Sequence, residues 1–247
     1  MCGIVGYVGQ RSASEVVLGG LARLEYRGYD SAGIAIVVPG NSLVSHKKAG
    51  KLSVLRDELE ANPLAQGTTG IGHTRWATHG PPTDANAHPH LADGGKLALI
   101  HNGIIENFDE LKSELQAQGE QFHSDTDSEV AAVMLGRAFQ DTQDLTLAMR
   151  AVVARLEGAF TLLGVHQDQP DVVVGARRNS PLVVGLGQGE NFLGSDVAAF
   201  VAYTDKAMAL GQDQIVTITP DSVTITTFEG EPATAAQFDI DWDASAA

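Results

Sequence analysis

The order of strand-like and helix-like segments is the feature that most constrains the fold of this chain. Short apolar or alternating runs closed by Gly, Pro or Asn predict strands, and apolar residues at helical spacing predict helices. Strands are expected at residues 3–9, 31–40, 42–50, 68–80, 96–103, 159–167, 171–178, 181–187, 190–196, 213–221 and 222–230. Helices are expected at residues 14–26, 52–62, 107–119, 124–140 and 145–158. Because strand-rich parts flank the helices without regular alternation, we expect an α+β layered domain with antiparallel sheets covered by helices, rather than a doubly wound parallel sheet.

Size and charge narrow the class of protein. With 247 residues, 43% of them hydrophobic, the chain can bury a core as one large domain or two small ones, which excludes a disordered chain. The net charge of -15, from 16 basic against 31 acidic residues, disfavours nucleic acid and anionic membrane surfaces as partners. There is neither a secretory leader nor an uncharged run of the roughly 20 residues that a membrane span needs. We expect a soluble, cytoplasmic protein, and the single cysteine, which excludes an internal disulfide, agrees with that.

Two local signals concern the fourth helix and the end of the chain. Thr126 is followed three residues later by Glu129, a capping box that predicts a helix start and places Asp127 in the first turn. The segment 231–247 loses periodicity and becomes rich in small and acidic residues, as in a linker or a frayed terminus. We therefore expect a domain at residues 2–238 and the start of a linker at 239–247.

The cysteine at position 2 is the first candidate for chemistry. If Met1 is removed, Cys2 becomes the N-terminal residue and carries a thiol of pKa about 8.5 and an α-amine of pKa about 8 on one carbon. The amine can accept the thiol proton, directly or through one water, and return it to a leaving nitrogen, as acyl transfer requires. The alternative is a buried cysteine that packs as a small hydrophobic residue at the start of the first strand.

Three further segments carry polar residues that suit an amino-acid ligand. Arg75 and Trp76 lie at a polar strand end that runs into a loop, where the fork of an arginine can grip a carboxylate and an indole can cover a pocket; a surface ion pair is the alternative for Arg75. Asn102 and Gly103 form either a hairpin turn or an oxyanion hole, with side-chain and main-chain amides facing a carbonyl oxygen. Asp127 either complements the helix dipole or accepts hydrogen bonds from a ligand ammonium.

Histidines cluster in the same part of the chain, at positions 73, 79, 88, 90 and 101. His88 and His90 are two positions apart, which puts both rings on one face of an extended segment, so a metal site is an alternative. Pro89 between them favours a turn, no cysteine lies nearby, and no HExxH-type motif is present. We therefore expect neither a metal nor a cofactor.

Eight segments together carry a family resemblance. They are CGIVGYVG, LEYRGYDSAG, HTRWATHG, NAHPH, HNGIIEN, SDTDSE, RRNSPLVVGLG and ENFLGSD, in this order between residues 2 and 196. The chain resembles the glutaminase domains of the glucosamine-6-phosphate synthase (glutamine-fructose-6-phosphate aminotransferase) family, which are class II glutamine amidotransferases of the N-terminal nucleophile hydrolase type. LEYRGYDSAG and HTRWATHG favour this family over the related amidophosphoribosyltransferases. The resemblance implies a four-layer α/β/β/α sandwich with two antiparallel sheets between helix layers.

The resemblance also implies a catalytic group of residues. Cys2 would be the nucleophile, freed by loss of the initiator methionine, with its own amine as the general base. Asn102 and Gly103 would form the oxyanion hole. Arg27 and Gly28 would support the nucleophile's end of the pocket.

A second group would bind L-glutamine. Arg75 would hold the α-carboxylate and Asp127 the α-ammonium, while Trp76, Thr78 and His79 would belong to a loop that closes over the substrate. Free glutamine is a zwitterion, so a site needs one fixed cation and one fixed anion at its amino-acid end. Arg75 and Asp127 supply this cation and this anion, so their charges suit glutamine even without the family resemblance.

The family further implies a partner that this chain lacks. A full synthase continues into a sugar-phosphate isomerase half, which binds fructose 6-phosphate and receives the ammonia, and the full-length enzyme is expected to be a homo-oligomer. We expect this chain to hydrolyse glutamine to glutamate and ammonia through a thioester, without sugar amination. A retained Met1 would acylate the proposed base and block the reaction. The glutaminase half of another amidotransferase and a non-catalytic amino-acid-binding module are the competing interpretations.

Overall fold

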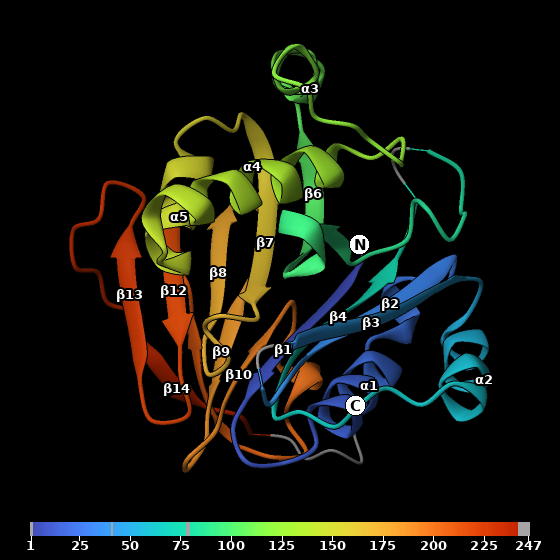
Figure 1. The fold of residues 1–247 in the computed structure, drawn as a ribbon. Coiled ribbons are helices and arrows are strands. Elements are labelled where there is room, and N and C mark those ends of the chain that lie inside the picture. The colour runs from blue at the N-terminus through green and yellow to red at the C-terminus, as the bar shows by residue number, and fades with distance from the viewer. Residues whose placement is uncertain (1, 41, 78–79, 242–247) are drawn as a thin grey trace.

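Two antiparallel sheets form the centre of the computed structural model, which describes residues 2–40, 42–77 and 80–241 (Figure 1). The larger sheet contains, in spatial order, β14 (Gln237–Asp239), β11 (Lys206–Ala209), β9 (Val183–Leu186), β10 (Asn191–Gly194), β1 (Gly3–Val8), β4 (Thr69–Arg75), β2 (Ser31–Val38) and β3 (Ser42–Ala49). The smaller sheet contains β13 (Val223–Thr227), β12 (Gln214–Ile218), β8 (Val173–Arg178), β7 (Gly158–His166), β6 (Leu97–Ile105) and β5 (His90–Ala92). Neighbouring strands in both sheets pair antiparallel, so the prediction of antiparallel sheets is confirmed.

Helices cover the outer faces of the two sheets (Figure 1). The helices α1 (Ala13–Arg23) and α2 (Leu52–Ala61) pack on the larger sheet, and α4 (Asp127–Thr142) and α5 (Leu145–Val153) on the smaller one, with α3 (Phe108–Ala117) packed on α4. One buried apolar cluster lies between the two sheets. A second lies between the larger sheet and its helices, and a third between the smaller sheet and its helices. The expected four-layer α/β/β/α sandwich is therefore confirmed. Within the described residues, no helix is long and apolar enough to span a membrane.

Burial on both faces explains the composition of the central strands. All six residues of β1 are buried, and β2 is buried along nearly its whole length, because one face of each strand meets helices and the other meets the second sheet. Such strands read as continuous apolar runs rather than alternating ones. The edge strand β3 differs, because it is only partly buried and carries Lys47 and Lys48, and charged residues suit an edge.

The helix that follows β1 ends earlier than its apolar spacing predicts. Residues 14–26 suggest one helix, but α1 stops at Arg23 and Leu24 leaves the helical region with φ -101° and ψ 2°. A short 3₁₀ turn, Glu25–Arg27, follows. This turn directs the chain back toward the end of β4, where Arg27 and Gly28 meet the candidate site.

The N-terminus of α4 begins where the capping signal predicts, with one difference. The Thr126 hydroxyl accepts a hydrogen bond from the Glu129 amide at 3.3 Å, which satisfies one free amide of the first turn. The Glu129 carboxylate accepts from the amides of His123 and Ser124, at 2.9 and 2.7 Å. In a capping box the Glu129 carboxylate would accept from the Thr126 amide. Here it accepts from the two amides just before that residue and so fixes the loop that enters the helix.

Three strands are missing from the sequence prediction, namely β5, β11 and β14. They have three or four residues each and lack a longer apolar run around them that would indicate a strand. β14 lies in the segment interpreted as a linker or frayed end, and it pairs Asp239 with Lys206 on β11. Strand pairing thus extends one residue past the expected domain end at 238, while the linker at 239–247 stays a prediction.

Candidate functional site

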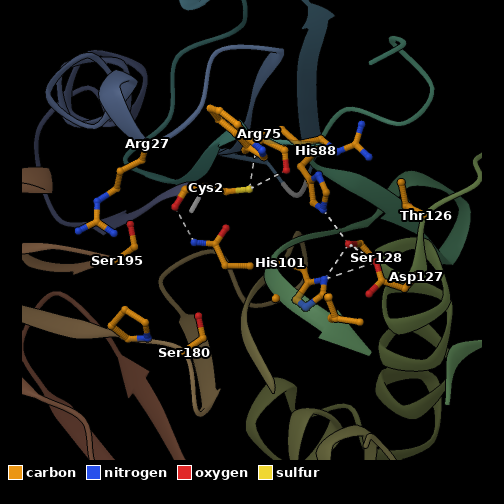
Figure 2. A pocket seen from close by; sticks show the side chains of 15 residues that line it. Cys2, Arg27, Arg75, His88, His101, Thr126, Asp127, Ser128, Ser180 and Ser195 are labelled. Carbon is orange, nitrogen blue, oxygen red and sulfur yellow. Dashed lines mark hydrogen bonds and ion pairs between the residues drawn. The ribbon is translucent and has the colours of Figure 1, made fainter. Parts of the chain in front are cut away.

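A cavity of about 280 Å³ lies where the start of β1, the ends of β4 and β6 and the start of α4 meet (Figure 2). This volume suits a small molecule rather than a macromolecule. It is lined by Cys2, Arg27, Arg75, Trp76, His88, His101, Asn102, Gly103, Ile104, Thr126, Asp127, Ser128, Ser180, Pro181 and Ser195. Seven of the ten residues expected from the sequence line this one cavity. Of the other three, Gly28 lies behind the wall, and Thr78 and His79 fall outside the described residues.

The Cys2 thiol faces the cavity and is held by the backbone of Trp76. The Trp76 amide donates a hydrogen bond to Cys2 Sγ at 3.1 Å, and Sγ lies 3.5 Å from the Trp76 carbonyl oxygen. Burial is the main cause that raises the pKa of the Cys2 thiol above its ordinary value. The resting residue is therefore a thiol, and any reaction as a nucleophile needs a base that removes its proton.

Asn102 and Gly103 lie inside strand β6 and not in a turn. They pair with Thr161 and Phe160 of β7, so the hairpin-turn interpretation is wrong. Gly103 has φ +120°, and a Cβ there would meet the Ala159 carbonyl oxygen at 2.0 Å. Only glycine fits this position, because a side chain would suffer both the unfavourable φ and the close approach. The NG pair therefore marks an unusual strand conformation at the cavity wall.

The Asn102 side chain joins the two sheets. Its Nδ2 donates to the main-chain carbonyl oxygen of Cys2 at 2.8 Å, and its Oδ1 lies 2.9 Å from His73 Nε2. The residue is 6% exposed, so both ends of the amide are bonded away from bulk water. An amide nitrogen thus points to the residue that carries the thiol.

Arg75 is a buried residue at the end of β4, so the surface ion-pair alternative is wrong. It is only 3% exposed, and its guanidinium donates to the carbonyl oxygens of Pro81 and Gly80 at 3.3 and 3.2 Å. These bonds tie the cavity to the segment that begins at Gly80. Gly28 approaches the Arg75 backbone from behind, where a Cβ would meet the Arg75 carbonyl oxygen at 2.8 Å.

Asp127 opens α4 and is held in place from β6. One carboxylate oxygen, Oδ2, accepts from the Ile105 amide at 2.8 Å. The other, Oδ1, lies 3.4 Å from Ser128 Oγ and 3.8 Å from His101 Nδ1. The residue is 3% exposed, so a buried carboxylate faces the cavity on the side away from Cys2 and Arg27 (Figure 2).

Two further expected residues line the cavity, Arg27 in an ion pair and Trp76 with an exposed ring. Arg27 pairs with Asp196, its guanidinium nitrogen lying 2.6 Å from the carboxylate. Trp76 is 50% exposed, and its ring meets Tyr29 edge-on at 5.3 Å between centroids. The backbone of Trp76 contacts the thiol while its ring is exposed, and its role in covering a substrate stays a prediction.

Four of the five histidines, at positions 73, 88, 90 and 101, are buried, and a hydroxyl group contacts one ring nitrogen in three of them. His88 Nε2 and His101 Nδ1 each lie 2.8 Å from Ser128 Oγ, and His90 Nε2 lies 2.9 Å from Thr126 Oγ1. Within the described residues, no group of His, Cys, Asp and Glu side chains has a metal-binding arrangement. Burial lowers the pKa of His88 and of His90 well below the ordinary value, so both rings are neutral near pH 7.

Several lining residues had no role in the sequence prediction. Ser128, Ser180, Pro181 and Ser195 lie in segments that carry the family resemblance, and Ser128 directly follows Asp127. The serine hydroxyl of Ser195 accepts from the Ile4 amide at 3.1 Å and so fixes the start of β1. The signal for these residues was their place in the motifs, because an isolated serine carries no pattern of its own.

Comparisons with known proteins agree with this arrangement. The profile of the "Glutamine amidotransferase domain" family matches residues 57–229, more than half of the chain. A glutamine–fructose-6-phosphate aminotransferase (isomerizing) from Leifsonia xyli subsp. xyli is 67% identical over 247 residues, which cover 100% of this chain and 40% of that protein. The enzyme of the same name from Streptomyces coelicolor is 60% identical over the same shares. The chain thus spans about two fifths of the length of these curated relatives.

A solved structure supports the same assignment. Glutamine phosphoribosylpyrophosphate amidotransferase from B. subtilis, complexed with ADP and GMP, superposes with a TM-score of 0.79 and 27% identity. The match covers 92% of this chain and 49% of that one. The family profile, the relatives and the layered fold therefore agree, and this chain belongs to the glutamine amidotransferase domain family.

Proposed function

We propose that this chain hydrolyses L-glutamine to glutamate and ammonia, with Cys2 as the nucleophile. The observation that carries the proposal is the meeting of four kinds of group in one small cavity: a thiol, an amide donor, a buried cation and a buried anion. A non-catalytic binding site would need only the charged pair. The thiol beside the amide donor is the addition that acyl transfer requires.

The two charged residues suit the amino-acid end of glutamine. Arg75 would bind the α-carboxylate with its planar fork, which matches a carboxylate better than a single ammonium does. Asp127 would accept from the α-ammonium through Oδ1, because Oδ2 is already bonded to the Ile105 amide. This arrangement leaves the side-chain amide of glutamine directed toward Cys2.

The proposed chemistry forms and breaks a thioester. The sulfur of Cys2 attacks the side-chain amide carbon of glutamine, and the carbonyl oxygen becomes an oxyanion that accepts from Asn102 Nδ2 and the Gly103 amide. Collapse of this intermediate breaks the carbon–nitrogen bond, and the leaving nitrogen takes the proton that came from the thiol, so ammonia departs. Water then attacks the thioester, which releases glutamate and restores the thiol.

The α-amine of Cys2 is the proposed base, which requires the removal of Met1. The raised pKa of the thiol supports the need for a base, and among the described residues the bonds of Sγ are to the Trp76 backbone. A terminal amine titrates near pH 8, so it can hold a proton transiently at neutral pH. A chain that keeps Met1 should be inactive because its amine is acylated.

The remaining roles complete the proposal. Arg27, paired with Asp196, and Gly28, packed on the Arg75 backbone, would hold the walls of the nucleophile's end. A loop with Trp76, Thr78 and His79 would close over the bound substrate. Closure of that loop would exclude water before the thioester forms.

The longer relatives extend the proposal to the whole protein. Their name, glutamine–fructose-6-phosphate aminotransferase, and their greater length support a second half that acts on fructose 6-phosphate. We propose that this half uses the ammonia to form glucosamine 6-phosphate. We also propose a cytoplasmic location and a homo-oligomeric full-length enzyme. By itself, this chain should make no amino sugar from fructose 6-phosphate, and that sugar should not change the rate of glutamine hydrolysis.

The test is covalent labelling with 6-diazo-5-oxo-L-norleucine, a glutamine-like electrophile. The chain without Met1, verified by intact mass, should gain one adduct that maps to Cys2, and excess L-glutamine should slow its formation while L-asparagine should not. Cys2→Ala and a chain that retains Met1 are the matched controls. Absence of labelling and of ammonia release from the Met1-free chain, with glutamine still bound, would replace the proposal with the binding-module interpretation.

A further inference from the structure

We infer that His73 is a positioning residue, which holds the Asn102 side-chain amide with its nitrogen toward Cys2. The catalytic consequence of this inference rests on the proposed glutamine hydrolysis. The side-chain amide of an asparagine can rotate by 180°, which exchanges its oxygen and its nitrogen, and an oxyanion needs the nitrogen as a donor. The residue that holds the amide in the correct orientation therefore contributes to the oxyanion hole.

His73 reaches Asn102 from the opposite sheet. It lies in β4 of the larger sheet, while Asn102 lies in β6 of the smaller one. His73 Nε2 lies 2.9 Å from the main-chain oxygen of His101 and 2.9 Å from Asn102 Oδ1. The ring is fully buried, so these two contacts are made without competition from bulk water.

The partners of the ring determine which of its nitrogens carries hydrogen. A main-chain carbonyl oxygen can only accept, so Nε2 of His73 must be the protonated nitrogen that donates to it. The other nitrogen, Nδ1, has no hydrogen-bond partner among the described residues, as expected for a bare nitrogen. Burial lowers the pKa of His73 to about 3, so the neutral ring with a single N–H is the form present near pH 7.

The donating Nε2 also determines the orientation of the Asn102 amide. The single hydrogen on Nε2 lies between the His101 oxygen and Asn102, and an amide nitrogen at 2.9 Å would set donor against donor, so Asn102 Oδ1 faces His73 and Nδ2 faces the other way. There it donates to the carbonyl oxygen of Cys2 at 2.8 Å, which also can only accept. A turned amide would lose both bonds and would place donor against donor and acceptor against acceptor.

This orientation leaves one amide hydrogen for the reaction. Asn102 Nδ2 carries two hydrogens, and the Cys2 carbonyl takes one of them. The second is available at the cavity wall, beside Gly103, for an oxyanion formed on the substrate. His73 itself does not line the cavity, so it acts through Asn102 and does not touch the substrate.

Two variants test the positioning role. His73→Leu keeps volume but removes the donor, while His73→Gln can place an amide N–H near the position of Nε2. For His73→Leu we expect kcat for glutamine to fall about 10- to 100-fold, below the 10²- to 10³-fold typical of losing an oxyanion donor outright. KM should change less than about threefold, because Arg75 and Asp127, which would bind the amino-acid end of glutamine, are not altered. His73→Gln should recover most of the lost kcat.

A second reaction of the same thiol separates positioning from general damage. Alkylation of Cys2 by iodoacetamide displaces iodide from a saturated carbon and forms no oxyanion, so His73→Leu should alkylate at nearly the wild-type rate. Equal losses of kcat and of alkylation rate would overturn the inference. A His73→Gln variant no more active than His73→Leu would do the same.

Nitrogen NMR of the unmutated chain gives a test that does not depend on whether a His73 variant folds. The His73 ring should show the Nε2–H neutral form from pH 6 to 8. An Nδ1–H form or a charged ring, in a chain that still hydrolyses glutamine, would overturn the inference alone. An inactive Met1-free chain with the Nε2–H form would instead overturn the proposed function and leave the amide orientation supported.

Discussion

The main-chain carbonyl oxygen of Cys2 accepts a hydrogen bond from Asn102 Nδ2 at 2.8 Å, across the boundary between the two sheets. The residue with the thiol and the residue with the amide donor are thus fixed relative to one another before any ligand binds. Their sequence separation of 100 positions is closed by the packing of the larger sheet on the smaller one. Preorganised donors of this kind need no rearrangement when charge develops on a substrate.

Asn102→Asp should lower kcat by about 10²- to 10³-fold, because a carboxylate has nearly the same shape but cannot donate to an oxyanion. Steady-state ammonia release measures the effect. Binding of L-glutamate, measured by calorimetry, should remain, since the residues at the amino-acid end are unchanged. A variant with undiminished kcat would remove Asn102 from the proposed oxyanion hole.

Asp127→Asn should raise KM for glutamine by about 10-fold or more, which corresponds to the loss of one charge-assisted bond to the α-ammonium. An asparagine oxygen can still accept from the Ile105 amide, so the start of α4 should stay intact. The matched substrate is glutaramate, which lacks the amino group. The variant and the parent chain should process glutaramate equally, and a variant still impaired with glutaramate would contradict the assigned contact.

Gly28→Ala should destabilise the fold by about 1–3 kcal/mol, the usual cost of forcing a methyl group into a filled space. The new Cβ would lie 2.8 Å from the Arg75 carbonyl carbon and oxygen, so the Arg75 backbone must shift. Glutamine binding should weaken as well.

Gly19→Ala in α1 is the matched control for that change. A Cβ there meets nothing closer than 3.7 Å, and alanine favours a helix over glycine by about 1 kcal/mol, so this variant should be slightly more stable. Urea unfolding of both variants checks the contrast. Equal effects at the two positions would show that the close approach at Gly28 is unimportant.

Acid should weaken the fold in the pH range where the buried histidines are neutral only in the folded chain. The pKa of His73 is lowered to about 3, and the pKa values of His88 and His90 also lie well below 6.5, with burial as the main cause. Below about pH 6.5 the unfolded chain takes up protons that the folded chain does not bind, so stability falls with falling pH. Above that pH these histidines contribute no slope.

Each such histidine contributes up to about 1.4 kcal/mol per pH unit between its folded pKa and about 6.5. Urea unfolding between pH 5 and 6 measures the slope. His90→Gln removes one titrating ring and should reduce the slope by about that amount, whatever its effect on absolute stability. An unchanged slope would contradict the assignment of His90 as a neutral buried residue.

The layered fold could be predicted because most of its strands and helices have strong local patterns. The apolar run at 31–40 and the apolar spacing at 145–158 correspond to β2 and α5, whose burial follows directly from those patterns. β14 could not be predicted, because a three-residue edge strand is defined by its partner β11 rather than by its own sequence. The early end of α1 at Arg23 likewise depends on the turn that follows it.

The candidate site shows a similar division. Arg75 and Asp127 could be named from charge and position, but their burial at 3% exposure each is a product of the sheet packing. Asn102 and Gly103 have the composition of a hairpin turn, and pairing with β7 keeps them in a strand. The contact of His73 with Asn102 crosses between two sheets, and no spacing along the chain indicates it.

The most direct test of the central claim is to capture the covalent intermediate on Cys2. The Met1-free chain is mixed with L-glutamine, quenched in acid during turnover, and analysed by intact mass and peptide mapping. We expect a mass increase of one glutamyl group on the peptide that begins at Cys2, which hydroxylamine removes and which Cys2→Ala lacks. Continued glutamine hydrolysis by Cys2→Ala at the parent rate, with no adduct on the N-terminal peptide of the parent chain, would contradict it.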